Sequence, residues 1–124
     1  MKLSSDISAV VTGGASGLGE ATARLLASKG VKVGIFDYNK ERGTEVASEI
    51  GGVFAHVNVA DNDMVDAGFE VVRKAHGQER ILINAAGIGL GMKTASRKRD
   101  TGAILAHDVA AFKRVIDILS LIHI

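Results

Sequence analysis

The glycine-rich stretch TGGASGLG, residues 12–19, is the feature that most constrains how this chain can fold. It follows a short apolar run, residues 7–12, and precedes a longer amphipathic run, residues 18–29. A short apolar run is typical of a buried strand, and apolar residues at helical spacing are typical of a helix that packs on a sheet. The stretch is therefore predicted to be a tight turn that joins a buried strand to a helix.

Three glycines of this turn, Gly13, Gly17 and Gly19, are candidates for binding a phosphate group, together with Ser16 and Leu18 at the helix start. Glycine permits the tight turn, close packing of helix on strand and close approach of a ligand to the backbone. The helix start offers free N–H groups and the positive end of its dipole, which suit a pyrophosphate. A glycine motif alone indicates little, so a turn without a ligand stays open as the alternative.

Short apolar runs and longer amphipathic runs alternate along the rest of the chain. The expected strands are residues 7–12, 31–37, 53–59 and 80–84, and the first two expected helices are residues 18–29 and 40–50. A third helix is expected to follow Asp61 and to run through about residue 75. Residue 106 or 107 is expected to lead into a fourth helix, which Asp108 caps and which runs through residue 118. Strands that are apolar throughout and separated by helices indicate a parallel sheet with both faces covered. Right-handed crossovers then give an α/β fold, a Rossmann-type doubly wound sheet that is incomplete at about four strands and four helices.

Local signals set the expected helix ends. Asn39, Asp61 and Asp108 precede three of the expected helices and can cap them. The third helix is expected to bury five residues, Met64, Gly68, Val71, Val72 and Ala75. A long polar loop is expected between the fourth strand and the fourth helix.

Asp37 ends the second expected strand, 18 residues after Gly19 (37 − 19 = 18). A carboxylate at this place can accept hydrogen bonds from both hydroxyls of an adenosine ribose and repels a 2′-phosphate, which predicts NAD rather than NADP. Lys40 and Arg42 point the other way, because a basic side chain can hold a 2′-phosphate. The alternative for Asp37 itself is an aspartate in a solvated turn before a helix.

The spacing TGxxxGxG at residues 12–19, followed by Asp37 and then INAAG at residues 83–87, resembles the short-chain dehydrogenase/reductase family. The resemblance covers residues 7–118, and residues 1–118 are expected to be one NAD-binding Rossmann half. It implies hydride transfer between NAD and a secondary alcohol by a parent enzyme that is a homotetramer. It also implies further cofactor-binding residues, namely Asn58, Val59, Asn84, Ala85, Ala86 and Gly87.

Among these residues, Asn84 matches the family pattern, whereas Ala85 and Asn58 depart from it. The resemblance implies that Asn84 stabilises the central sheet, while Ala85 stands where relatives have a second Asn or a Cys. Asn58 stands where relatives often have an Asp that binds the adenine amino group. Because an amide offers both a donor and an acceptor, the adenine contact is still expected here.

Residues 87–102 and 107–118 are similar to the type-2 3-hydroxyacyl-CoA dehydrogenases, which implies 3-hydroxyacyl-CoA as the substrate and a place in fatty-acid or branched-chain acyl-CoA oxidation. Another alcohol, such as a hydroxysteroid, remains an alternative. The loop is locally basic, with Lys93, Arg97, Lys98 and Arg99. These side chains are expected either to meet a CoA phosphate or to form a solvated surface, and charge runs usually do the latter.

The family reaction needs a Ser and a Tyr-x-x-x-Lys pair, in which the Tyr acts as general base. The single tyrosine of this chain is Tyr38, and Arg42 stands four residues later. No catalytic residue is therefore assigned, and the chain alone is predicted to be inactive. A non-catalytic NAD-binding module is the competing hypothesis.

The last six residues, 119–124, do not follow the family pattern, which has an Asn where Leu119 stands. Their sequence LSLIHI reads as a one-frame translation of a transposon-end sequencing adapter. We interpret these residues as a non-native tail, with a diverged helix end as the alternative.

Composition narrows the partners. The formal net charge is +1, which favours neither nucleic acid nor a membrane surface as a partner. The chain has no cysteine, so a disulfide framework is excluded and a reducing cytoplasm is the expected location. No apolar run is long enough to span a bilayer. The four histidines lack metal-ligand spacing, so no metal is expected. The family resemblance implies that the substrate is a small molecule.

Overall fold

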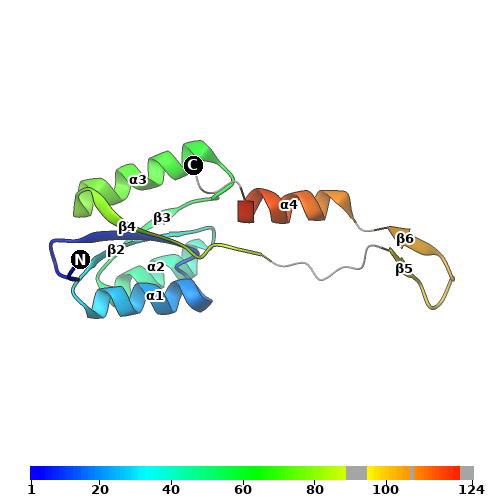
Figure 1. Ribbon diagram of the computed structural model, residues 1–124, viewed down its shortest axis with the longest axis horizontal. Coiled ribbons are helices and arrows are strands. Elements are labelled where there is room, and N and C mark those ends of the chain that lie inside the picture. The colour runs from blue at the N-terminus through cyan, green and yellow to red at the C-terminus, as the bar shows by residue number, and fades with distance from the viewer. Residues whose placement is uncertain (89–94, 107, 121–124) are drawn as a thin grey trace. The chain divides into compact units, whose positions relative to one another are not determined.

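The computed structural model describes residues 1–88, 95–106 and 108–120. It divides into two compact units, Met1–Ala86 and Gly87–Ile124, and each is treated by itself below. Figure 1 shows the elements of both units. The first unit carries the sheet and the candidate site.

The sheet of the first unit has four parallel strands, β1 (Ser8–Thr12), β2 (Lys32–Asp37), β3 (Val53–His56) and β4 (Glu79–Asn84). Their order in the sheet is β3-β2-β1-β4. The chain therefore builds outward from β1 through β2 to β3 and then crosses to the other side of β1. In open α/β sheets a ligand binds outside the carboxyl ends of the strands at such a reversal, which here lies between β1 and β4.

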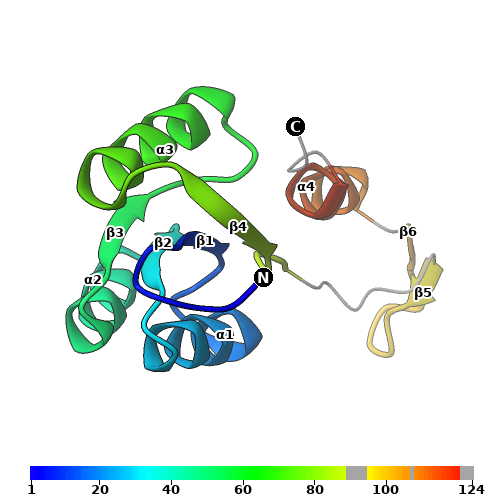
Figure 2. The same cartoon turned by 60° about the vertical axis from the view of Figure 1, so that its left-hand side comes forward.

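Three helices cover this sheet, α1 (Gly17–Ser28), α2 (Lys40–Ile50) and α3 (Asn62–His76). Figures 1 and 2 show α1 and α2 on one face and α3 on the other. Asn39 and Asp61 cap α2 and α3 by accepting hydrogen bonds from Arg42 N and Met64 N. The prediction of a Rossmann-type doubly wound parallel sheet is confirmed.

Both faces of the sheet are buried. Toward α1 and α2 the core contains Val11, Val33 and Ile35, which are at most 1% exposed. Toward α3, glycine makes room for close packing, since a Cβ added at Gly34 would lie 2.4 Å from a methyl carbon of Val72. Continuous apolar strands are what this two-sided burial requires.

Two predictions for this unit are wrong in detail. The third strand ends at His56 rather than at residue 59, because the chain turns at Asn58, whose side-chain Oδ1 accepts from Ala60 N. In α3, Val71 and Ala75 are exposed, whereas Gly68 and Val72 are buried. The helix packs through a narrow stripe, since small Gly68 lies against Phe36 and Val57.

The second unit contains β5 (Ala95–Arg97), β6 (Ile104–Ala106) and α4 (Val109–Ser120). The two short strands pair antiparallel, so the expectation of a loop without regular structure is wrong for this segment. Pairing is a long-range property that the polar sequence of the segment did not indicate. The fourth helix begins at Val109, after Asp108, whose carboxylate accepts from Ala110 N as expected of a cap.

None of the helices in the described ranges combines the length and the apolar character that crossing a bilayer requires.

Candidate functional site

The turn after β1 has a backbone that only glycine accommodates at two positions. Gly13 and Gly17 have φ values of 66° and 56°, in the left-handed region that L side chains rarely adopt. A Cβ added at Gly13 would lie 2.7 Å from the Ala86 Cα, whereas a Cβ at Gly17 would meet no atom within 4 Å. Gly13 is therefore required by the chain that follows β4, and Gly17 leaves open space beside the helix start.

The remaining motif glycine, Gly19, packs directly against the backbone of Gly13 in the same turn. A Cβ added at Gly19 would lie 2.1 Å from the carbonyl oxygen of Gly13. The turn is also tied to the neighbouring strand, because Gly13 N donates to the carbonyl of Phe36 at 2.7 Å. The glycine spacing thus fixes a compact turn in which the helix starts directly on the end of β1.

The start of α1 is open to solvent. Ser16 is the N-cap residue, in an extended conformation, and its side chain makes no capping hydrogen bond. Ser16 and Gly17 are exposed, and Leu18 is 85% exposed. The N–H groups of a first helical turn have no partner within the helix, so an uncapped and exposed start is suited to an anion.

Thr12 connects this turn to the segment after β4, a role that the sequence interpretation missed. Its hydroxyl is 3.2 Å from both Ala85 N and Ala86 N and accepts from them, and the residue is 4% exposed. Ala85 N also donates to the Thr12 carbonyl at 3.2 Å. A hydroxyl residue at the carboxyl end of a strand with an apolar centre was the signal available for this role.

Asp37 lies at the carboxyl end of β2 and bridges two turns. One carboxylate oxygen accepts from Ala15 N in the glycine turn at 3.0 Å, and the other accepts from Asn39 N at 2.9 Å. The residue is half-buried. A carboxylate has about four lone-pair sites, so both oxygens keep capacity to accept from a ligand hydroxyl.

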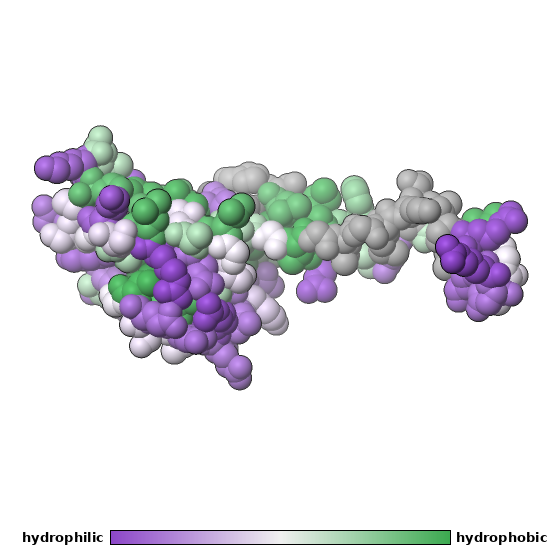
Figure 3. Space-filling view, turned by 90° about the horizontal axis from the view of Figure 1, so that it is seen from below, coloured by the Kyte–Doolittle hydropathy of each residue, from purple (hydrophilic) through white to green (hydrophobic). Residues whose placement is uncertain are grey.

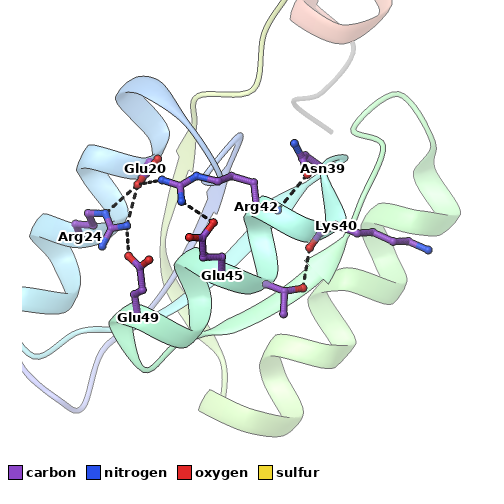
Figure 4. Close-up of polar contacts among 8 residues, drawn as sticks. Glu20, Arg24, Asn39, Lys40, Arg42, Glu45 and Glu49 are labelled. Atoms are coloured by element: carbon purple, nitrogen blue, oxygen red, sulfur yellow. Dashed lines mark hydrogen bonds and ion pairs between the residues drawn. The ribbon is translucent and has the colours of Figure 1, made fainter.

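A network of charged side chains joins α1 and α2 (Figure 4). Arg42 Nη2 is 2.6 Å from Glu20 Oε1, and Arg42 Nη1 is 2.8 Å from Glu45 Oε2. Arg24 pairs with Glu20 at 2.8 Å and also with Glu49. Hydrogen bonds from Arg24 and then Arg42 lower the pKa of Glu20 below its usual range.

Arg42 is therefore already occupied by two carboxylates. The hydrogen bonds from Glu45 and Glu20 raise its pKa further. Arg42 is the residue whose charge the sequence analysis set against the NAD prediction, and both carboxylates that it contacts lie on α1 and α2.

The other predicted site residues lie at the carboxyl ends of β3 and β4. Asn58 is half-buried and its carbonyl accepts from Asp61 N at 2.9 Å, while Val59 is 8% exposed. Asn84 ends β4 in register with Thr12 and is exposed. Gly87 is exposed and belongs to the second unit.

Tyr38 is the single tyrosine of the chain, and Arg42 rather than a lysine follows it at four residues. Tyr38 is 71% exposed, and its ring faces that of His56 with 5.2 Å between the centroids. His56 Nε2 is 3.1 Å from the Tyr38 carbonyl oxygen. Within the described ranges, no group of three or more His, Cys, Asp or Glu residues is placed to hold a metal ion.

The basic residues of the hairpin lie in the second unit. Arg97, Lys98 and Arg99 are exposed, and the hairpin is hydrophilic over most of the face seen in Figure 3. The backbone of its turn is ordered by hydrogen bonds, with Lys98 N donating to the Ala103 carbonyl at 2.8 Å. Lys93 lies outside the described residues.

Comparisons with known proteins agree with these features. The chain is 38% identical over 111 residues to 3-hydroxyacyl-CoA dehydrogenase type-2 of Drosophila melanogaster, covering 88% of this chain and 42% of that protein. It is 34% identical over 112 residues to the protein of the same name from Rattus norvegicus, covering 89% of this chain and 41% of that protein. The chain thus spans about two fifths of the length of these curated relatives.

A solved structure gives the same result. The 3-ketoacyl-(acyl-carrier-protein) reductase from Brucella melitensis complexed with NADH superposes with a TM-score of 0.76 at 30% identity, covering 90% of this chain and 43% of that chain. Residues 8–120 match the short chain dehydrogenase family. With the glycine turn, the acid after β2 and the segment after β4 in their places, the chain belongs to the short-chain dehydrogenase family.

Proposed function

We propose that this chain is the NAD-binding half of a dehydrogenase that transfers a hydride between NAD and a secondary alcohol, with 3-hydroxyacyl-CoA as the substrate class. The observation that carries the proposal is the arrangement at the carboxyl ends of β1 and β2. There, the uncapped start of α1 lies beside a carboxylate that is hydrogen-bonded to the glycine turn. In such an arrangement the helix start would bind the pyrophosphate of a dinucleotide, and the carboxylate would accept from the hydroxyls of its adenosine ribose.

The residues of the site fit the cofactor. Gly17 leaves space where a side chain would stand, which supports close approach of a pyrophosphate to the N–H groups of the first turn of α1. Asp37 would accept from the hydroxyls of the adenosine ribose, and Asn58 with Val59 would border the adenine. When bound, the nicotinamide ring accepts or gives the hydride.

NAD is favoured over NADP by charge. The Asp37 carboxylate would lie against a 2′-phosphate, and like charges at close range repel. The Arg42 guanidinium is neutralised by Glu20 and Glu45. The solved relative with bound NADH supports a nicotinamide cofactor for this family member.

The acyl-CoA part of the proposal is supported by the relatives named 3-hydroxyacyl-CoA dehydrogenase type-2 and by the exposed basic hairpin. Titration with CoA tests it. The triple variant Arg97→Gln, Lys98→Gln, Arg99→Gln should weaken CoA binding by about tenfold, since charge-assisted bonds to phosphate are lost. Equal affinity of the variant and the wild type would leave the hairpin as solvated surface.

One observation favours a second candidate, a non-catalytic NAD-binding module. The only tyrosine is Tyr38, and no lysine follows it at four residues. Binding without turnover is what such a module would give. The first candidate is preferred because the family match continues through α4, beyond the residues that form the candidate site.

Calorimetric titration with NADH and NADPH tests the cofactor proposal. Wild type should bind NADH more tightly, and Asp37→Asn should weaken NADH binding by about tenfold because the ribose hydroxyls lose a charged acceptor. Asp66→Asn removes the same charge from an exposed position on α3 and should leave both affinities unchanged. Equal affinity of the wild type for the two nucleotides would contradict the NAD preference.

A further inference from the structure

The backbone of Arg42 lies close to Asp37, but its guanidinium group contacts Glu20 and Glu45. Its backbone N–H donates to the Asn39 side chain at 3.1 Å, and the Asn39 N–H donates to the Asp37 carboxylate at 2.9 Å. Arg42 therefore stands one capping turn away from Asp37. A guanidinium starting from this position would be a suitable partner for a phosphate on the neighbouring ribose, because its donor geometry matches phosphate.

Glu20, on the neighbouring helix α1, forms an ion pair with the Arg42 guanidinium. It follows Gly19 directly, and its backbone N–H donates to the Ser16 carbonyl at 3.1 Å, so it belongs to the first turn of α1. Its side chain is 17% exposed and contacts the guanidinium groups of both Arg24 and Arg42. Figure 4 shows Arg42 reaching from α2 toward Glu20, with Glu45 on its other side.

Lys40, the other basic residue near Asp37, does not share this network. Its side chain extends away from the charged cluster in Figure 4. Of the two cations that the sequence places after β2, Arg42 is thus the one that carboxylates engage.

We infer that Glu20 and Glu45 determine cofactor specificity by holding the Arg42 guanidinium away from the ribose 2′ position. This inference rests on the proposed function, namely that a nicotinamide dinucleotide binds with its adenosine ribose at Asp37. Discrimination against a 2′-phosphate then has two sources, repulsion by Asp37 and sequestration of Arg42. The first source is the acidic residue at the end of β2. The second source is the ion pair between Arg42 on α2 and Glu20 on α1.

The test compares the ratio of the NADPH and NADH dissociation constants in matched variants. Glu20→Gln with Glu45→Gln should lower this ratio by about tenfold relative to the wild type, because the released Arg42 gains a charge-assisted bond to the 2′-phosphate. The NADH constant itself should change by less than about threefold, since neither residue is expected to contact NADH. Each single variant should shift the ratio in the same direction by less, which provides a second reading if the double variant folds poorly.

Three controls isolate Arg42. Glu41→Gln with Glu70→Gln removes the same charge from exposed positions on α2 and α3, outside the Glu20 network, and it should not move the ratio. Adding Arg42→Gln to the first double variant should restore the wild-type ratio. Arg42→Gln alone should leave the ratio unchanged, because the wild-type guanidinium does not reach the 2′ position.

An unchanged ratio in the first double variant, an equal fall in the charge-matched control, or a fall that survives Arg42→Gln would overturn the inference. Equal binding of NADH and NADPH by the wild type would instead contradict the proposed NAD preference. Absence of any nucleotide binding by the wild type would overturn both.

Discussion

Residues 1–86 and residues 87–124 differ in how much of their apolar surface they bury. The first unit buries apolar side chains on both faces of its sheet, and Val10, Val11 and Ile35 are 0% exposed. In the second unit, none of the residues whose burial is described is buried. Its helix α4 leaves Val109 76% and Ile116 39% exposed. Burial of apolar area is the main favourable term in folding, so stability should be concentrated in the first unit.

The same difference separates two kinds of site. The candidate nucleotide site is built from backbone that packing and hydrogen bonds fix, as the contacts of Thr12 and Gly13 with the segment after β4 illustrate. The basic hairpin displays charge on exposed side chains. A site made of fixed backbone can be pre-organised for its ligand, whereas an exposed charged surface contributes mainly long-range attraction.

The largest expected effect concerns turnover, which neither region should support. We expect no NAD reduction by this chain with 3-hydroxyacyl-CoA, since loss of a positioned general base alone costs on the order of a hundredfold to ten-thousandfold in rate. The rate of NAD reduction is measured from the absorbance of NADH at a saturating concentration of NAD. Turnover that disappears in Tyr38→Phe would show that the chain contains its own base and would contradict this prediction.

The next effect sharpens the contrast in burial. Ile35→Ala should lower the free energy of unfolding by about 2–5 kcal/mol, because it opens a cavity in a fully buried position. Ile116→Ala, which removes the same atoms from an exposed position in α4, should cost less than about 1 kcal/mol. Urea unfolding followed by circular dichroism measures both. Similar losses in the two variants would break the comparison between the units.

A smaller effect separates the two left-handed glycines. Gly17→Ala should cost about 1–2 kcal/mol of unfolding free energy, because only the backbone conformation is strained. Gly13→Ala should cost more, since the new methyl group would also overlap the backbone at Ala86. Equal losses would mean that the segment after β4 does not press on Gly13, which denaturant titration of the pair would reveal.

The smallest effect depends on pH. Burial, and then the charge of Lys32, lower the pKa of His76 below its usual 6.5. The folded state therefore disfavours the protonated ring, so stability is full above that pH and falls as the pH drops below it. Glu20 and Glu79 have lowered pKa values and lose their contribution only below their usual 4.5.

Urea midpoints at pH 7.5 and 5.5 isolate the histidine. The wild type should lose slightly more stability over this interval than His76→Gln. An equal change in both proteins would remove His76 as the cause.

Local chemistry explains what the sequence could predict. The limits of α2 and its Asn39 cap follow from neighbouring residues, and the structure has both. The end of β3 could not be predicted in this way, because Val57 and Val59 continue the apolar run while the Asn58 turn interrupts the strand. The antiparallel pairing of β5 with β6 depends on contacts between segments, which the polar composition does not indicate.

The site shows the same division. The glycines and Asp37 are site candidates from their spacing along the chain alone, and the structure brings the Asp37 carboxylate to the glycine turn. The role of Thr12 depends on residues 73 and 74 positions away, and the pairing of Arg42 with Glu20 spans 22 positions. Such partners are set by the sheet order and the packing of helices, so they became visible only in the folded chain.

Titration of the ¹⁵N-labelled chain with NADH, followed by amide chemical shifts, tests the central claim most directly. The account predicts saturable shifts in the first unit, centred on residues 13–19 and 37, with smaller shifts near residues 58–59 and 84–86. Amides of the hairpin, residues 95–106, should move little with NADH. Saturable shifts confined to the hairpin, or no saturable shift at the glycine turn, would contradict the account.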